Sequence, residues 1–279
     1  MGGYQILRKV AQSNTAEIYH AVRLVGPGRG SEFALKILRE EFANDRTERG
    51  YLENEFRVGS LFEHPNLIRV YDYSDAGGRP MLVLDLIQGP SLRQHLEKGR
   101  PPLGPALGWL AQAADGLACM HEEDYVHRDV KPQNILIDKG GIVKVIDFAI
   151  AMRQDTSLGK YLLRRLKERR RPGTWSYMSP EQIQNHRLTG QSDIYSLGVA
   201  VFEVAAGRLP YTADTAQGLM EQHVYGKIPS LLSVRNDAPM ELNELVQAMV
   251  AKNPLDRPSG MRYVCAKLKD LAATHRALT

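Results

Sequence analysis

A short polar run near the middle of the chain constrains this sequence more than any other feature. It reads His127-Arg128-Asp129-Val130-Lys131-Pro132-Gln133-Asn134 and places a carboxylate, an ammonium group and a carboxamide close together. An apolar, strand-like stretch follows at 142–146, and Asp147 comes directly after it. The side chains of Asp129, Lys131, Asn134 and Asp147 are therefore candidates for a single site.

These four side chains have the chemistry that phosphoryl transfer to a hydroxyl requires. The reaction needs a carboxylate to accept the proton, a cation to balance developing charge, and ligands for magnesium. Asp129 and Lys131 supply the first two groups. The oxygens of Asn134 and Asp147 suit a hard cation such as Mg²⁺.

The chain changes character at about residue 88. Turn signals such as Gly26-Pro27-Gly28 separate strands predicted over 4–10, 17–24, 32–38, 68–74 and 81–86. Apolar residues at helical spacing predict one helix over 46–62 in this part, and further helices over 92–98, 107–122, 193–206, 213–225 and 241–251. We expect a small β-rich lobe with the hinge at 1–88, a larger helical lobe at 89–279, and a ligand cleft between them.

Composition and charge exclude several kinds of protein. The net charge is +4, but six basic residues and one acid lie between Arg164 and Arg171, so the rest of the chain is close to neutral. This distribution argues against a nucleic-acid-binding face. No apolar run approaches the roughly 18 residues that a membrane span needs. We expect a cytoplasmic chain, or the cytosolic domain of a longer protein, whose oligomeric state the sequence does not indicate.

The cysteines and two of the histidines show no metal-ligand pattern. Cys119 and Cys265 give no disulfide framework either, and we expect both in the core. His121 and His223 lack metal-ligand spacing as well, and we expect them at the surface.

Together the motifs resemble a eukaryotic-type Ser/Thr protein kinase domain, similar to the bacterial members of that family, from Tyr4 to about Leu271. The resemblance implies an α+β, bilobal protein-kinase fold whose small antiparallel β lobe carries one main helix. It also implies ATP and Mg²⁺, with Mn²⁺ as an alternative ion, and a protein substrate. Lys131 is typical of Ser/Thr rather than Tyr specificity.

The resemblance assigns roles to individual residues. Asp129 is the implied catalytic base, and Lys131 steadies the γ-phosphate. Lys36 is the phosphate-binding lysine, and Glu55 is its ion-pair partner. The implied metal ligands are Asn134 and Asp147.

The implied nucleotide pocket draws on both lobes. Leu84 resembles the gatekeeper residue, and the backbones of Asp85 and Ile87 would bind adenine. The complete set is Ala11, Ser13, Ile18, Ala34, Lys36, Leu84, Asp85, Ile87 and Leu136.

Two further motifs, Gly173-Thr174 and Ser179-Pro180-Glu181, resemble the end of an activation segment, where a peptide docks. Residues 158–173 contain neither Ser nor Thr. The candidate phosphorylation or docking residues are therefore Thr156, Ser157, Thr174 and Ser176. Structural roles are implied for three residues: Glu181, its ion-pair partner Arg257, and Asp193, which anchors the catalytic loop.

Two departures from the family pattern concern nucleotide binding. The loop pattern G-x-G-x-x-G-x-V reads Ala11-Gln12-Ser13-Asn14-Thr15-Ala16-Glu17-Ile18, so all three glycines are replaced. Because glycine lets the backbone approach a phosphate, we expect weak ATP affinity, although the Ser13 hydroxyl could donate a hydrogen bond. In the second departure Ala149 replaces the Gly after Asp147-Phe148. If that position needs positive φ, Ala costs more than about 0.4–1 kcal/mol.

The basic segment between Arg164 and Arg171 has two interpretations. Leu158, Leu162 and Leu166 recur every four residues, which predicts a short amphipathic helix. This helix would dock an acidic partner or substrate, or gate the cleft. Alternatively, the segment is a solvated insertion, as most charge runs are.

Three functions compete at this point. The first is an active Ser/Thr protein kinase, with reduced activity as an open alternative. The second is a pseudokinase that serves as a scaffold and binds nucleotide weakly or not at all, for which the altered loop and Ala149 argue. The third is a small-molecule kinase, against which the peptide-docking motifs argue.

Overall fold

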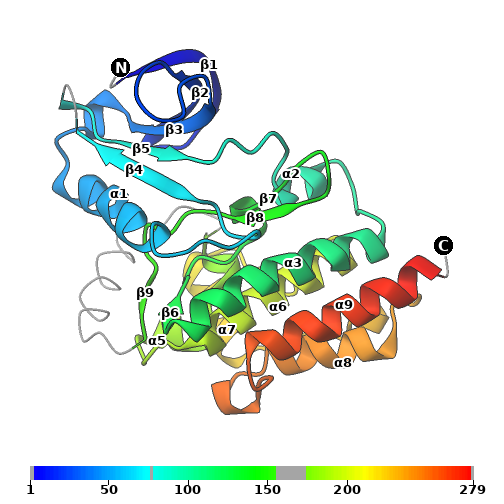
Figure 1. Ribbon diagram of the computed structural model, residues 1–279. Coiled ribbons are helices and arrows are strands. Elements are labelled where there is room, and N and C mark those ends of the chain that lie inside the picture. Colours follow the sequence, from blue (N-terminus) through cyan, green and yellow to red (C-terminus); the bar gives the residue numbers. More distant parts are fainter. Residues whose placement is uncertain (1–2, 76–77, 155–173, 278–279) are drawn as a thin grey trace.

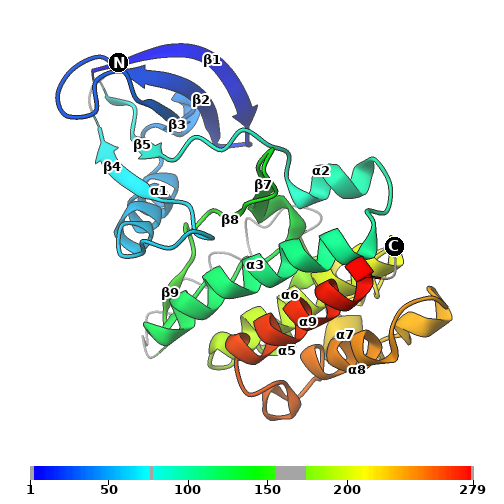
Figure 2. The same cartoon turned by 45° about the vertical axis from the view of Figure 1, so that its right-hand side comes forward.

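The computed structural model describes residues 3–75, 78–154 and 174–277. A small lobe built on an antiparallel sheet stands above a larger lobe of helices (Figures 1 and 2). The expected α+β, bilobal architecture is confirmed. The predicted boundary after residue 88 lies in the connection between β5 and α2.

The sheet of the small lobe has five strands in the order β1-β2-β3-β5-β4, and all neighbouring pairs are antiparallel. Successive side chains of a strand point to opposite faces. In β3 this alternation buries Phe33 and Leu35 on one face, in a cluster with Val83. It directs Ala34 and Lys36 to the other face, towards α1. The strands are β1 (Tyr4–Gln12), β2 (Ala16–Arg23), β3 (Glu32–Leu38), β4 (Val70–Ser74) and β5 (Met81–Leu84).

The helix α1 (Arg46–Gly59) lies against this sheet (Figure 1). Asp45 caps it, because its side chain accepts hydrogen bonds from the backbone N–H groups of Thr47 and Glu48. The helix ends at Gly59, three residues before the predicted end at Phe62. The close approach of Val70 and Phe148 explains a glycine there, since a Cβ at this position would lie 2.3 Å from Val70 Cγ2.

The larger lobe is organised around α3 (Leu103–Glu122) and α6 (Gly190–Ala206), which pack against each other and against α9. Every residue of α6 from Ser192 to Ala205 is buried. The remaining helices are α2 (Leu92–Glu97), α5 (Pro180–Gln184), α7 (Ala216–Tyr225), α8 (Met240–Met249) and α9 (Met261–Ala277). Short strands flank the loops that hold Asp129 and Asp147: β6 (Tyr125–Val126), β7 (Ile135–Ile137), β8 (Val143–Val145) and β9 (Met152–Arg153).

Several predicted helix starts were off by a few residues. Predicted helix 107–122 begins at Leu103, because Pro105 is tolerated in a first turn. Predicted helix 213–225 begins at Ala216, because the Thr215 side chain caps it by accepting from Gly218 N–H. Helix α9 was not predicted. Cys265 is buried as expected, whereas Cys119 is only partly buried.

Gly89 fastens the hinge to the larger lobe. A Cβ on this residue would lie 1.8 Å from the backbone oxygen of Ile137. The Ile137 N–H also donates to the Pro90 carbonyl (3.0 Å). Only glycine fits this approach of the connection to β7, so Gly89 and Pro90 are attached to the larger lobe.

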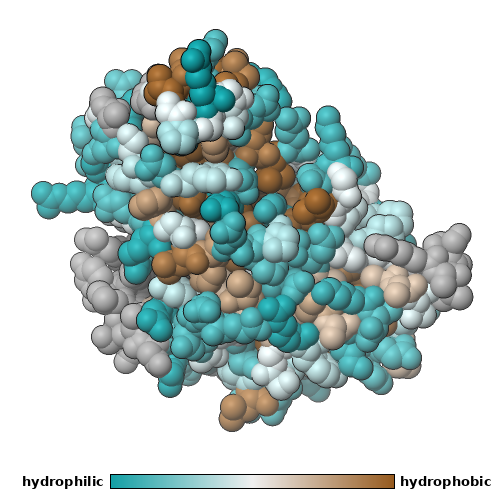
Figure 3. Space-filling view, in the orientation of Figure 1, coloured by the Kyte–Doolittle hydropathy of each residue, from teal (hydrophilic) through white to brown (hydrophobic). Residues whose placement is uncertain are grey.

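Most of the surface shown in Figure 3 is hydrophilic, with hydrophobic side chains at the top of the small lobe and near the junction of the lobes. The exposed apolar residues of β1 and its neighbourhood are Ile6, Leu7, Val10, Leu24 and Val25. Within the described residues, no helix combines the length and apolar character needed to cross a bilayer.

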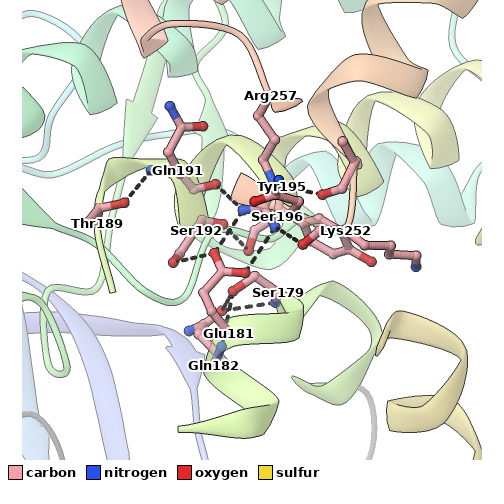
Figure 4. A network of polar contacts seen from close by, with 12 residues as sticks. Ser179, Glu181, Gln182, Thr189, Gln191, Ser192, Tyr195, Ser196, Lys252 and Arg257 are labelled. Atoms are coloured by element: carbon pink, nitrogen blue, oxygen red, sulfur yellow. Dashed lines mark hydrogen bonds and ion pairs between the residues drawn. The ribbon is translucent and has the colours of Figure 1, made fainter. Parts of the chain in front are cut away.

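A buried ion pair joins α5 to the connection between α8 and α9 (Figure 4). Arg257 Nη1 and Nη2 donate to the two oxygens of Glu181 at 2.7 and 2.9 Å. Ser192 Oγ donates to the same carboxylate (2.7 Å), and Arg257 also donates to the carbonyls of Gln191 and Ala251. Burial raises the pKa of Glu181, but its bonds with Arg257 outweigh this effect and lower it.

Replacing Arg257 by Ala should therefore leave a buried carboxylate without its cation. We expect a loss of about 3–5 kcal/mol in the free energy of unfolding, measured by urea denaturation. Arg257→Lys should recover only part of it, because an ammonium cannot bind both oxygens as a planar fork. If the free energy of unfolding of Arg257→Ala lay within about 1 kcal/mol of the wild-type value, the substitution would have an effect close to that of an ordinary surface substitution. This result would contradict a structural role for the ion pair.

Candidate active site

Strand β3 and helix α1 bring Lys36 and Glu55 together beside Asp147. Lys36 Nζ lies 2.5 Å from Glu55 Oε2 and 3.7 Å from Asp147 Oδ1. Burial lowers the pKa of the Lys36 ammonium, but the charges of Asp147 and Glu55 outweigh burial and raise it. Burial, together with the charge of Asp147, raises the pKa of Glu55 to about 7 despite Lys36. The Lys36 ammonium thus pairs with the carboxyl groups of both Glu55 and Asp147.

The run from His127 to Asn134 lies between β6 and β7, in a loop that Asp193 fixes from α6. His127 N–H and Arg128 N–H each donate to the Asp193 carboxylate at 2.8 Å. Arg128 has φ +70°, a conformation uncommon for a side chain of this size. The buried carboxylate of Asp193 holds the backbone in this strained turn, directly before Asp129.

The Asp129 carboxylate is held by two polar side chains of the same run. Lys131 Nζ lies 2.6 Å from Asp129 Oδ2, and Asn134 Nδ2 donates to the same oxygen (3.0 Å) and to the Asp129 carbonyl (2.9 Å). The 3-10 helix η3 (Pro132–Asn134) turns the chain so that Asn134 points back at Asp129. The structure therefore brings together Asp129, Lys131 and Asn134 as the sequence predicted.

Asn134 and Asp147 also have suitable donor atoms for Mg²⁺. The Asn134 amide nitrogen is bonded to Asp129, which leaves its side-chain oxygen as a ligand atom. The Ile146 N–H donates to the Asn134 carbonyl (3.0 Å), so the residue next to Asp147 is attached to Asn134. Burial raises the pKa of Asp147, but Lys36 and Lys131 outweigh it and lower that pKa. An ionised carboxylate and an amide oxygen fit a magnesium ion.

The apolar residues predicted to bind adenine come from both lobes. Ala34 and Leu84 are buried and pair across β3 and β5, while Ile18 and Leu136 are half-buried. Asp85 is fixed by its side chain: Tyr71 Oη donates to Asp85 Oδ1 (2.7 Å), and Lys144 Nζ lies 3.6 Å from Oδ2. Ile87 lies between Asp85 and Gly89, in the connection that leads to the larger lobe.

Comparison with known sequences assigns the family, because the profile of the protein kinase domain matches residues 4–268. This chain belongs to the protein kinase family. The chain is 34% identical over 276 residues to serine/threonine-protein kinase PknL of Mycobacterium tuberculosis, covering 96% of this chain and 65% of PknL.

Two further relatives cover smaller parts of their own length. Serine/threonine-protein kinase PknH of Mycobacterium bovis is 32% identical over 284 residues, covering 100% of this chain and 44% of PknH. Serine/threonine-protein kinase PrkC of Bacillus subtilis is 32% identical over 258 residues, covering 92% of this chain and 38% of PrkC. The chain therefore spans less than two thirds of these relatives.

The loop that lacks the family's glycines forms a tight turn between β1 and β2. Ser13 N–H donates to the Ala16 carbonyl (2.7 Å), and Ser13 Oγ accepts from Ala16 N–H (2.9 Å) and Thr15 N–H (3.4 Å). Ala11 pairs with Ile18 across the hairpin. The Ser13 hydroxyl donates to the Ala16 carbonyl (3.2 Å) as well, so it is engaged inside the turn rather than directed at a phosphate.

The second departure from the family pattern causes no backbone strain in this arrangement. Among the described residues, the non-glycine residues with positive φ are Asp124, Arg128, Asp147 and Asn185. Ala149 is not among them, so the cost considered for an alanine at positive φ does not arise. Asp147 itself takes φ +73°.

The predicted activation-segment residues are only partly described. Thr156, Ser157 and the basic run from Arg164 to Arg171 lie outside the described residues. Thr174 begins the 3-10 helix η4 (Thr174–Tyr177), and Ser176, in the same helix, is 7% exposed. Modification of the Ser176 hydroxyl would therefore need this segment to move.

Sequence reasoning missed several polar contacts around the site. His121 and His223, expected at the surface, are partly and fully buried: His121 Nε2 donates to Asp193 Oδ2 (2.8 Å), and Tyr195 Oη lies 3.0 Å from His223 Nδ1. Asn54 on α1 also went unnoticed, although it contacts the segment after Asp147. Spacing alone gave no signal for these residues, because their partners are distant in sequence.

The raised pKa of Glu55 predicts a pH-dependent stability. The native state holds the Glu55 proton more tightly than the unfolded chain, so this contribution is present below about pH 4.5 and is lost as pH rises to about 7. Relative to Glu55→Gln, the wild-type free energy of unfolding should fall by on the order of 3 kcal/mol across this window. Urea titrations at several pH values measure the difference. A difference that does not change with pH would exclude the raised pKa.

Proposed function

We propose that this chain is a Ser/Thr protein kinase domain that transfers the γ-phosphate of ATP to a hydroxyl group of a protein substrate. The observation that carries the proposal is the contact of Asp129 with Lys131 and Asn134, opposite the pair of Lys36 and Glu55. Its relatives are named serine/threonine-protein kinases.

Asp129 is suited to accept the proton of the substrate hydroxyl. In the described part of the chain, Lys131 and Asn134 both bind its Oδ2. Its Oδ1 can therefore accept a hydrogen bond from the incoming hydroxyl. Because Lys131 is only 2.6 Å from the base, its ammonium can also lie beside the transferred phosphoryl group and balance its charge.

Lys36 would bind the phosphates that do not transfer. Glu55 and Asp147 hold its ammonium from two sides, and this fixed position requires no rearrangement when the nucleotide enters. Mg²⁺, when held by Asn134 and Asp147, would neutralise phosphate charge at this place. The substrate class remains a proposal: the basic run from Arg164 to Arg171 favours an acidic protein partner.

A second function, a pseudokinase that acts as a binding module, is favoured by the turn at Ser13. The N–H groups of Ser13, Thr15 and Ala16 are bonded within the turn. Arg39 N–H also donates to the Thr15 carbonyl (2.9 Å), which fastens the turn to the end of β3. The loop is thus closed on itself, with these N–H groups unavailable to phosphate oxygens.

Phosphate transfer separates the two functions. With ATP and Mg²⁺ or Mn²⁺, the wild type should phosphorylate itself or an added protein, and Asp129→Asn should reduce the rate by about 100-fold or more because the base is lost. Asp214 is an exposed acid in the connection between α6 and α7. Asp214→Asn makes the same chemical change as Asp129→Asn, serves as the matched control and should retain the wild-type rate. Equal incorporation by wild type and Asp129→Asn would reject the kinase proposal.

Calorimetry with Mg·ATP tests the turn. The wild-type dissociation constant should be weaker than micromolar. Ser13→Gly should bind about 3–10-fold more tightly, because it releases the N–H groups of Thr15 and Ala16 from one hydrogen bond each. Ser13→Ala removes the hydroxyl but keeps the Cβ. Comparing its affinity with that of Ser13→Gly therefore separates the effect of the lost hydrogen bonds from the effect of greater backbone freedom. A wild-type constant at or below 1 μM, which is about −8 kcal/mol, would contradict weak binding.

A further inference from the structure

Asn54 connects α1 to the backbone of the segment that follows Asp147. Its side-chain nitrogen donates to the carbonyls of Phe148 (3.2 Å), Ala149 (3.0 Å) and Ala151 (3.0 Å). These partners lie more than ninety residues away in sequence. One carboxamide on a helix therefore gathers three carbonyls of a single turn, which a solvated asparagine would not do.

The orientation of this carboxamide is fixed from its other end. Arg57, one turn further along α1, donates to Asn54 Oδ1. Because the oxygen is engaged there, the NH₂ group must face the three carbonyls. A carboxylate at this position would instead place an oxygen against three oxygens, so the site distinguishes Asn from Asp although their shapes are nearly the same.

The segment that Asn54 binds needs support from its surroundings. Asp147 is held at φ +73°, which a non-glycine residue adopts only when its neighbours stabilise it. Phe148 is fully buried, and its ring fits against Gly59, where a Cβ would lie 2.8 Å from Phe148 Cδ2. Gly59 leaves room for the Phe148 ring, and Asn54 binds the backbone carbonyls that follow Asp147. Helix α1 therefore contacts this turn at two points.

Asn54 and Glu55 are adjacent in α1, and they bind different parts of the site. Glu55 binds Lys36, and Asn54 binds the turn whose Asp147 lies 3.7 Å from the same lysine. We propose that Asn54 is a positioning residue that fixes the turn after Asp147, so that seating α1 aligns Asp147 and Lys36 together. The effect of Asn54 on catalysis rests on the proposed kinase function, whereas its contact with the turn after Asp147 does not.

Amide hydrogen exchange of the nucleotide-free chain tests the structural content. Ala151 N–H donates to the Phe148 carbonyl (3.1 Å), and β9 pairs with β6, so residues 147–153 should be protected. Asn54→Asp should accelerate exchange over 147–153 by about tenfold, since it replaces hydrogen bonds by repulsion. Asn54→Ala should do so to a smaller extent. Glu53→Ala, the exposed neighbour on α1, is the matched control and should exchange as wild type does.

Magnesium dependence tests the catalytic consequence. The Mg²⁺ concentration that gives half of the maximal rate should rise about 10–100-fold in Asn54→Asp, as is usual when the support of a metal ligand is removed. Asn54→Gln, which keeps the NH₂ group, should lie nearer to wild type. A residue that only stabilised the fold would lower the melting temperature without moving this concentration.

The outcomes are distinguishable from a failure of the kinase proposal. If wild type transfers no phosphate, the function is wrong, and the exchange experiment still decides the role of Asn54. If Asn54→Asp does not fold, Asn54→Ala carries the test, because alanine favours the helix more than asparagine does. Unchanged exchange over 147–153 in the folded Asn54 variants, or an unchanged magnesium requirement in an active enzyme, would overturn the proposal.

Discussion

The buried carboxylate of Asp193 is the constraint on which the rest of the site depends. It lies on helix α6, within the stretch from Ser192 to Ala205 that is buried throughout, and accepts from two consecutive backbone N–H groups, those of His127 and Arg128. Burial alone would raise its pKa, but these bonds and that of His121 lower it. An ionised group inside the larger lobe thus holds the strained turn before Asp129. The catalytic loop has its position because a helix core, which cannot shift easily, carries its anchor.

From this anchor the contacts extend in two directions. Gln182 Nε2 donates to the Arg128 carbonyl (2.9 Å), which joins the catalytic loop to α5 and so to the Glu181–Arg257 pair. His127 Nε2 donates to the Ile146 carbonyl (3.1 Å), which joins the loop to the residue before Asp147. Asn54 then continues the connection into the small lobe. The site is therefore one connected set of hydrogen bonds across both lobes, and not two halves brought together by nucleotide alone.

The sequence predicted the parts of the site that adjacent residues determine. Asp129, Lys131 and Asn134 come from one run, whereas Lys36 was assigned through the resemblance to the kinase family. The sheet of the small lobe was also predictable, because its strands are short apolar runs between clear turn signals. The ends of the helices were harder to predict. Capping by the Thr215 side chain moves the start of α7, and Pro105 in the first turn moves the start of α3, each by several residues. Asn54, His121 and Gly59 could not be predicted, since each is defined by a partner far away in the chain. The predicted base, metal ligands and phosphorylation residues stay predictions until activity is measured.

The closed turn at Ser13 has a consequence for the order of the hairpin between β1 and β2. The N–H groups of Ser13, Thr15 and Ala16 already have acceptors inside the turn. A ligand that used these donors would have to replace hydrogen bonds that are already formed, so the net gain would be small. The tip of this hairpin is therefore organised by its own side chain before a ligand arrives, and ligand entry would change its mobility little.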